Sequence, residues 1–261
     1  MRKIYEIIFR LVYILKINTL LKWITKQDDV IIMYHEIYDK ESFKEQMDYL
    51  KDNYEVISLE EYVKKLKLNK VKEKNERSNL VITFDDGHKS TYSIAYPILK
   101  ELNIKASIFV VPNFLPDKEY MSIDEVVEVS NNNIFEIGAH TMNHRDLGKC
   151  SLNEIEYEIK EAKYFLEKIL NKNITTFAYP FGKKHNYNEY AIKILKEYDF
   201  ICSVTTERGL NISKDYYELN RIGVSDCDTM PVFISKLERY YPYKITLILG
   251  NFFENIKRLL K

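Results

Sequence analysis

The sequence predicts an α/β fold with a parallel sheet, either closed into a barrel or left open, in one large domain. Short apolar runs typical of strands alternate with amphipathic helical stretches between residues 30 and 224. The chain has 261 residues and is 46% hydrophobic, which is enough to bury the core of one large α/β domain. Several apolar runs are followed directly by polar side chains, as in barrels whose functional groups lie at the carboxyl ends of the strands.

The order of the elements follows from the spacing of the apolar residues. The run at 79–84 is continuously apolar, as expected of a parallel strand buried on both faces. Ser151 followed by Glu154 predicts a capping box at the start of a long helix. Strands are predicted at 30–34, 54–57, 79–84, 106–111, 134–137, 175–179, 200–205 and 218–224, and helices at 43–50, 59–68, 90–102, 123–129, 151–170 and 187–198.

The two ends of the chain differ from the domain between them, which we place at residues 27–235. Residues 1–26 and 236–261 have apolar residues at helical spacing beside many Lys and Arg. This pattern predicts an amphipathic N-terminal helix and an amphipathic C-terminal helical extension. Such helices either pack on the domain or lie on a membrane surface, and the same amphipathicity fits both interpretations.

Composition restricts the compartment and the partners. Arg10, Lys16 and Lys22 interrupt the N-terminal apolar stretch, so neither a membrane-spanning helix nor a cleavable signal peptide is predicted. We therefore expect a cytoplasmic protein or one held peripherally at the membrane. Lys and Arg together number 39, as do Asp and Glu, so no basic field favours nucleic acid as a partner. The three cysteines lack CxxC spacing, which argues against a disulfide framework or a cysteine-type zinc site.

Two short motifs at the ends of predicted strands supply the side chains of a metal site. They are Thr83-Phe84-Asp85-Asp86-Gly87 and His140-Thr141-Met142-Asn143-His144. Adjacent carboxylates on extended backbone point in different directions, so one can bind a metal while its neighbour acts as a base. Histidines four residues apart on a helical turn can chelate one ion. Either motif alone is often structural, but a barrel would bring both together with His35 and residues 180–182 at one mouth.

The chain resembles the polysaccharide deacetylase family, carbohydrate esterase family 4 with its NodB homology domain, over roughly residues 30–225. The matching segments are VIIMYHEI at 30–37, LVITFDDG at 80–87, YPILKELNIKASIFV at 96–110, FEIGAHTMNHRDL at 135–147, FAYPFG at 177–182 and ELNRIGV at 218–224. Their order and spacing are also similar to the family's. The resemblance implies a distorted (β/α) barrel of about seven parallel strands and a metal-dependent hydrolase.

Carried over by position, the resemblance assigns chemistry to the motif residues. The implied ligands of Zn²⁺, or of another divalent transition metal, are Asp86, His140 and His144. Asp85 is the implied base, Arg221 its orienting partner, and His35 the acid that protonates the leaving amine. Asp146 is expected to support His144 from behind.

The FAYPFG turn is the implied site of oxyanion and substrate contacts, through Phe181, Pro180 and Tyr179. The chain departs from many family members at Ala178, where an arginine is common, and in having no histidine near its C-terminus. Both departures fit the branch of the family with YH and FAYPFG-like motifs. His88 is expected in a solvent-exposed loop.

The resemblance implies removal of N-acetyl groups from GlcNAc-type sugars of a cell-surface polysaccharide or its precursor, giving a free amine and acetate. The expected partner is an N-acetylated glycan, with peripheral membrane contact through the terminal helices. Two alternatives stay open. A noncatalytic glycan-binding or scaffold member of a polysaccharide biosynthesis complex fits the departure at Ala178 and the amphipathic ends. A deformylase of a lipid-linked aminosugar keeps the chemistry and changes the acyl group.

Overall fold

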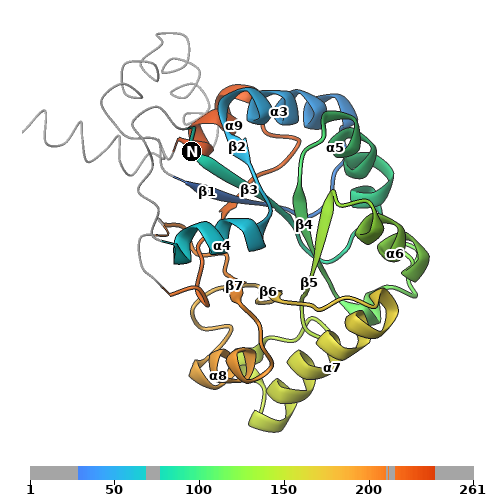
Figure 1. Ribbon diagram of the computed structural model, residues 1–261, viewed down its shortest axis with the longest axis vertical. Helices are drawn as coiled ribbons and strands as arrows, with labels where there is room; N and C mark the ends of the chain where they lie inside the picture. Colours follow the sequence, from blue (N-terminus) through green and yellow to red (C-terminus); the bar gives the residue numbers. More distant parts are fainter. Residues whose placement is uncertain (1–28, 69–76, 210, 212–214, 239–261) are drawn as a thin grey trace, which may run out of the picture. The chain divides into compact units, whose positions relative to one another are not determined.

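The computed structural model describes residues 29–68, 77–209, 211 and 215–238 (Figure 1). Residues Asp28–Cys227 form one compact unit, which contains the whole described sheet. The predicted amphipathic ends, 1–26 and 236–261, lie wholly or mostly outside the described residues and stay predictions. Among the described helices, none is long and apolar enough to cross a membrane.

A parallel sheet forms the centre of this unit. Its continuous path runs β7-β6-β5-β4-β3-β1-β8, and each strand pairs in parallel with the next. The strands are β1 (Val30–Tyr34), β3 (Asn79–Phe84), β4 (Ala106–Val110), β5 (Phe135–Ala139), β6 (Thr176–Ala178), β7 (Cys202–Val204) and β8 (Ile222–Gly223). The sheet curls around its own axis (Figure 1), and the predicted distorted (β/α) barrel of about seven parallel strands is confirmed.

The barrel closes along a seam made by one bent segment before and within β8. Leu219 forms a parallel bridge with Val204 of β7, whereas Ile222 pairs with Ile32 of β1. The predicted strand at 218–224 is therefore shorter in the structure, because the segment changes its pairing partner halfway. Arg221 lies at this change of partner.

The amino end of the barrel is filled by the segment that follows helix α3 (Lys40–Asn53). There β2 (Glu55–Val56) pairs with the start of β3, and α4 (Leu59–Lys67) follows it. Tyr62 and Val63 of α4 belong to one buried cluster with inward-facing strand residues such as Val81. Burying this many apolar side chains removes them from water and makes the barrel interior a packed core.

The other helices of the unit lie around the outside of the curled sheet (Figure 1). The predicted helix at 90–102 begins with a π-helical turn, Thr91–Ala95, because Pro97 lacks the N–H that a regular α-helical turn needs. The remaining helices are α3 (Lys40–Asn53), α5 (Tyr96–Leu102), α6 (Ile123–Asn131), α7 (Leu152–Leu170) and α8 (Glu189–Glu197), with α9 (Met230–Leu237) outside the unit.

Packing between α3 and the sheet fixes the positions of two strand ends. The ring of Tyr34 stacks on Phe84 at 5.5 Å and meets Phe43 of α3 edge-on at 5.4 Å. The Tyr34 hydroxyl donates a buried hydrogen bond of 2.6 Å to Gln46. Since Tyr34 and Phe84 are the last residues of β1 and β3, the side chains that follow them begin from a rigid base.

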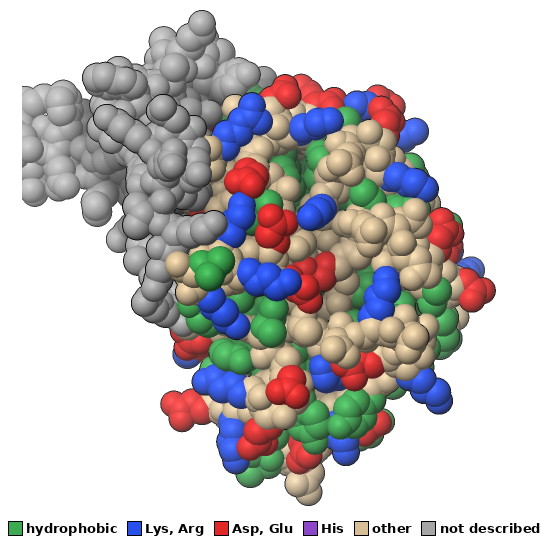
Figure 2. Space-filling model, in the orientation of Figure 1, with side chains coloured by type: hydrophobic (Ala, Val, Ile, Leu, Met, Phe, Trp, Pro, Cys, Tyr) green, Lys and Arg blue, Asp and Glu red, His purple; other side chains and the backbone are tan. Residues whose placement is uncertain are grey.

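The surface carries both signs of charge. Figure 2 shows acidic and basic side chains interspersed over the visible face, without a large patch of either sign. This distribution agrees with the equal numbers of acidic and basic residues in the chain.

Candidate active site

The carboxyl edge of the sheet gathers the polar residues of the motifs. His35 follows β1, Asp85 and Asp86 follow β3, His140 follows β5, and Pro180 and Phe181 lie just past β6. Arg221 directly precedes β8. The parallel sheet thus brings together side chains that are far apart in the sequence.

Asp86, His140 and His144 form a group that could hold a metal ion. Their nearest nitrogen and oxygen atoms all lie within 4.8 Å of one another. Asp86 Oδ1 is 3.4 Å from Nε2 of His140 and 3.4 Å from Nε2 of His144. Two ligand atoms about 2.1 Å from one tetrahedral ion are roughly 3.4 Å apart, so the three side chains fit a divalent metal such as zinc. Asp86 Oδ1 is also buried without a hydrogen-bond partner among the described atoms.

The two histidines are prepared for this role by their surroundings. His140 Nδ1 donates to the carbonyl oxygen of Ala178 at 2.7 Å, which turns Nε2 toward Asp86. Burial would lower the pKa of His140, but the neighbouring carboxylates of Asp86 and Asp85 outweigh it and raise this pKa. Burial and the charge of His140 lower the pKa of His144 to about 4, which keeps that imidazole neutral at physiological pH. Burial would raise the pKa of Asp86, but contacts with His140 and His144 outweigh it and lower this pKa to about 2.

Asp85 has a different environment from its neighbour. Its two oxygens accept hydrogen bonds of 2.6 and 2.7 Å from the guanidinium of Arg221. Both side chains are buried, and Arg221 also donates to the Thr205 carbonyl at 2.8 Å and to the Thr83 hydroxyl at 3.1 Å. Burial would raise the pKa of Asp85, but the charges of Arg221 and His140 outweigh it and hold this pKa below its usual range. Asp85 is therefore a fixed carboxylate.

Left-handed backbone conformations separate the side chains of the motifs. Asp86, Thr141, His144 and Phe181 have φ values of 69°, 62°, 56° and 60°. Each such residue costs roughly 1 kcal/mol or more, and strain of this kind concentrates at functional sites. At Asp86 the turn lets one carboxylate point to Arg221 and the next point to the histidines.

His35 lies at the opening of the site. Its Nε2 is 4.0 Å from Asp85 Oδ2, and its side chain is 53% exposed. An imidazole in this position can reach both the buried carboxylate of Asp85 and a molecule bound at the mouth.

In the FAYPFG turn, Phe181 lies at the mouth of the site and Tyr179 lies in the core. Phe181 is 55% exposed, and no described backbone carbonyl accepts from its N–H. Tyr179 is fully buried, stacks on Tyr187 at 4.0 Å and donates to the Tyr217 carbonyl at 3.1 Å. The ring of Tyr179 thus supports the turn from within. Gly182 has a φ of 63°, and a Cβ there would lie 2.6 Å from the Thr206 nitrogen.

The loop between His140 and His144 is held by a residue that sequence reasoning missed. Glu158 of α7 accepts hydrogen bonds from the backbone N–H of Asn143 at 2.9 Å and from its side-chain amide at 2.8 Å. The sequence did contain a sign of this role, because Glu158 is a carboxylate within the apolar face of an amphipathic helix, and a buried carboxylate needs hydrogen-bond partners. Asp146, which we expected to support His144, instead caps the short helix η3 (Leu147–Lys149) and accepts from Asn186.

His88 also differs from its expectation. Its side chain is only 22% exposed, its Nε2 lies 3.6 Å from Glu36, and its ring packs against Tyr120. It therefore lies in the wall beside the site.

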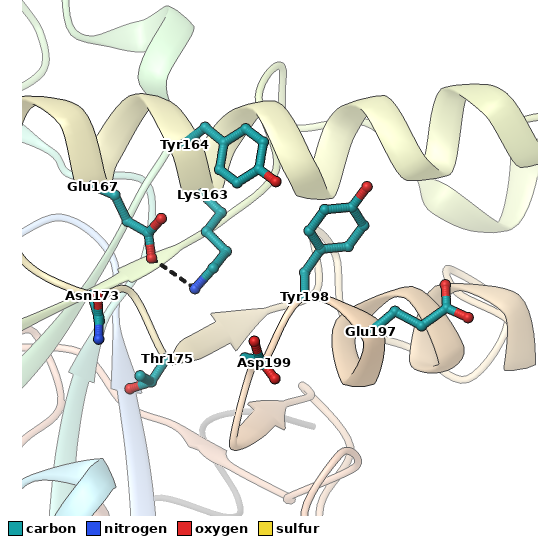
Figure 3. A pocket seen from close by; sticks show the side chains of 8 residues that line it. All are labelled: Lys163, Tyr164, Glu167, Asn173, Thr175, Glu197, Tyr198 and Asp199. Carbon is teal, nitrogen blue, oxygen red and sulfur yellow. Dashed lines mark ion pairs between the residues drawn. The ribbon is translucent and has the colours of Figure 1, made fainter.

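A separate hollow of about 400 Å³ lies at the amino ends of β6 and β7 (Figure 3). Thr175 and Asp199, which precede these strands, line it with residues of α7. Lys163 pairs there with Glu167 at 2.8 Å and also donates to the Ile174 carbonyl. Because its lysine is paired and the motif residues lie at the opposite end of the strands, this hollow is distinct from the candidate active site.

Comparison with known proteins shows which family the chain is similar to. Residues 72–202 match the family model described as polysaccharide deacetylase. A putative polysaccharide deacetylase of Bacillus subtilis, YxkH, is 31% identical over 205 residues, covering 75% of this chain and 71% of that protein. A poly-β-1,6-N-acetyl-D-glucosamine N-deacetylase of Staphylococcus epidermidis is 27% identical over 210 residues, covering 75% and 70%. The structure of the Streptococcus pyogenes deacetylase PplD in complex with acetate matches with a TM-score of 0.72 and 27% identity, over 80% of this chain and 97% of that one.

Proposed function

The chain belongs to the polysaccharide deacetylase family, and we propose that it is a metal-dependent hydrolase that removes N-acetyl groups from GlcNAc-type sugars of a cell-surface polysaccharide or its precursor. The observation that carries this proposal is the meeting of the Asp86, His140 and His144 donor atoms beside a buried carboxylate, Asp85. A relative's name, poly-β-1,6-N-acetyl-D-glucosamine N-deacetylase, supports an amino-sugar polymer as the substrate class.

In the proposed site, Asp86, His140 and His144 hold a divalent metal, with zinc the ion that best suits two nitrogens and one carboxylate oxygen. Such an ion, when bound, polarises the acetyl carbonyl and acidifies water. The neutral state of His144 favours binding, because a protonated imidazole cannot act as a ligand.

Asp85 acts as the general base in this mechanism. It takes a proton from the water that attacks the carbonyl carbon of the acetyl group. Arg221 holds both carboxylate oxygens, and each oxygen keeps a second lone pair for the proton. The backbone N–H of Phe181, at the mouth, donates to the oxyanion that develops on the acetyl oxygen.

His35 acts as the general acid. The amide C–N bond breaks only when the departing nitrogen receives a proton, because an amide anion is a poor leaving group. His35 stands 4.0 Å from Asp85 and is half-exposed at the opening, where a sugar nitrogen would lie. The products are acetate and a free amine.

The test measures acetate released from N-acetylglucosamine oligomers by the metal-loaded protein. Asp85→Asn should lower kcat by about 10²–10⁴-fold and retain the bound metal, because Asp85 is the base and not a ligand. Asp86→Ala should lose the metal itself. Asp48→Asn, a surface carboxylate of α3 paired with Lys44, is the matched control and should behave as the unaltered protein.

The proposal fails if the metal-loaded protein releases no acetate from any oligomer. The mass lost from the sugar distinguishes acetyl from formyl release. Metal binding without turnover on any amide would favour the noncatalytic glycan-binding alternative.

A further inference from the structure

Rings form a continuous row along the carboxyl edge of the barrel. Tyr120 lies 5.4 Å from His88 and 4.5 Å from Phe114, measured between ring centroids. His144 lies 5.9 Å from Phe114 on one side and 4.9 Å from Phe181 on the other. The rings follow β3, β4, β5 and β6 in the order in which those strands neighbour one another. The row therefore runs along the rim, with a candidate metal ligand within it.

The row stays open to solvent. Phe181 is 55% exposed, and Phe114 and Tyr120 are partly exposed. Exposed aromatic surface contributes little to folding, because the rings keep part of their area in water. A run of such rings beside a catalytic centre is the surface on which a flat apolar face of a ligand packs.

The loop that carries Phe114 and Tyr120 is fixed on both sides. The Met121 N–H donates to the Gly87 carbonyl at 2.9 Å, next to the Asp85–Asp86 motif. On the other side, the Asn113 N–H donates to the Met142 carbonyl at 3.2 Å, in the loop that carries the two histidines. Binding to a surface held in this way costs little ordering entropy.

We propose that Phe114 and Tyr120 form a stacking subsite for the sugar next to the one that loses its acetyl group. The inference rests on the proposed function and adds to it the two residues that bind the neighbouring sugar of the polymer. The C–H face of a pyranose ring is apolar and packs against an aromatic ring, while its hydroxyl and amide groups stay at the edge in water. Phe181 provides the corresponding surface on the other side of His144.

Binding measured without turnover tests this subsite. In an Asp85→Asn background, titration calorimetry gives the affinity for the monomer and the tetramer of N-acetylglucosamine, with β-1,4 and with β-1,6 linkages. The tetramer should bind more tightly than the monomer. Adding Phe114→Ala or Tyr120→Ala should weaken tetramer binding by about tenfold, the loss of one stacked ring, and abolish the preference for the longer chain.

Two controls keep the result interpretable. Phe114→Leu and Tyr120→Leu keep an apolar side chain for folding but lack the flat ring, and should also lose the preference for the tetramer. Tyr157→Ala removes an exposed tyrosine of α7 that is 52% exposed and outside the row, and should leave tetramer affinity unchanged.

Equal affinity of the Asp85→Asn protein for monomer and tetramer overturns the inference, as does unchanged tetramer affinity in the ring variants. Acetate release by the unaltered protein is measured in a separate assay and tests the proposed function. Tetramer-selective binding without acetate release refutes the proposed function alone, and acetate release without loss of binding in the ring variants refutes the subsite alone.

Discussion

Asp85 and Asp86 are adjacent in the chain, but their carboxylates have different partners. Asp85 is buried against Arg221, whereas Asp86 shares its Oδ1 with two histidines. Asp86 also has a left-handed conformation, so the backbone turns directly after the strand, with Asp85 facing Arg221 and Asp86 facing the histidines. In the proposed mechanism, Asp86 is a ligand of the metal and Asp85 takes the proton from water.

Arg221→Lys tests how much the fork of the guanidinium contributes. Lysine keeps the charge but cannot contact both oxygens of Asp85 while also bonding the Thr205 carbonyl. We expect kcat for acetate release to fall by about 10–100-fold with little change in KM, because the base is misplaced by a fraction of an ångström. Arg145→Lys, whose arginine makes a 3.3 Å surface contact with Glu154, is the control. An unchanged kcat in Arg221→Lys would refute the positioning role.

At the residue scale, the sequence predicted the motif residues better than their supports. Asp85, His140 and Phe181 stand in short motifs at strand ends, where a local pattern is visible. Tyr179 belongs to the same turn, but its side chain faces the core. Its partners there are Tyr187 and Tyr217, which come later in the chain, so the motif alone does not reveal this orientation. Phe114 and Tyr120 belong to no motif, and only the pairing of loops places Phe114 beside His144 and Tyr120 beside Phe114.

At the scale of elements, α7 was predicted closely and β8 was not. The helix has its own signals, a capping box at Ser151 and an apolar face, so its start does not depend on distant contacts. The segment at 218–224 is shared between β7 and β1, and a change of partner leaves no mark on local periodicity. Tertiary pairing therefore decided where the last strand lies.

Glu158→Gln tests how α7 holds the loop between His140 and His144, which carries two of the proposed metal ligands. The glutamate accepts two hydrogen bonds from Asn143, and a glutamine would oppose one of those donors with its own N–H groups. Affinity for the metal should fall by about tenfold, which is the lower end of the range of about 10–100-fold for losing a residue that supports a metal ligand. Competition with a chelator measures this affinity. Added metal should restore activity.

Glu161→Gln is the matched control, because this side chain lies on the same helix, is 42% exposed and makes only a 3.9 Å contact with Lys160. If Glu158→Gln binds the metal as tightly as Glu161→Gln does, the loop holds its shape without Glu158.

At the scale of the whole molecule, the two ends of the barrel shift the pKa values of their acids in opposite directions. At the carboxyl edge, Arg221 and the histidines keep Asp85 and Asp86 ionised. At the amino end, Glu136 of β5 accepts from the backbone N–H of Glu60, and no cation among the described residues contacts it. Burial raises the pKa of Glu136 from 4.5 to about 7, and the charge of Glu60 adds to this shift.

The pH dependence of folding should therefore carry a contribution from Glu136. Its pKa is higher in the folded protein than in the unfolded chain, so the contribution is fully present below about pH 4.5 and is lost as the pH rises through about 7. A shift from 4.5 to about 7 corresponds to at most about 3 kcal/mol. The side chain keeps some contact with solvent, which reduces the expected loss to about 1–2 kcal/mol.

Glu136→Gln removes this titration while keeping the shape of the side chain. Urea unfolding from pH 4.5 to pH 8 should show the variant gaining about 1–2 kcal/mol relative to the unaltered protein as the pH rises, because only the glutamate must ionise in the barrel. Glu45→Gln, an exposed glutamate of α3, should show a constant difference over the same range. A pH-independent difference for Glu136→Gln as well would mean that Glu136 ionises as freely in the folded barrel as in the unfolded chain, and that the amino end of the barrel is open to water.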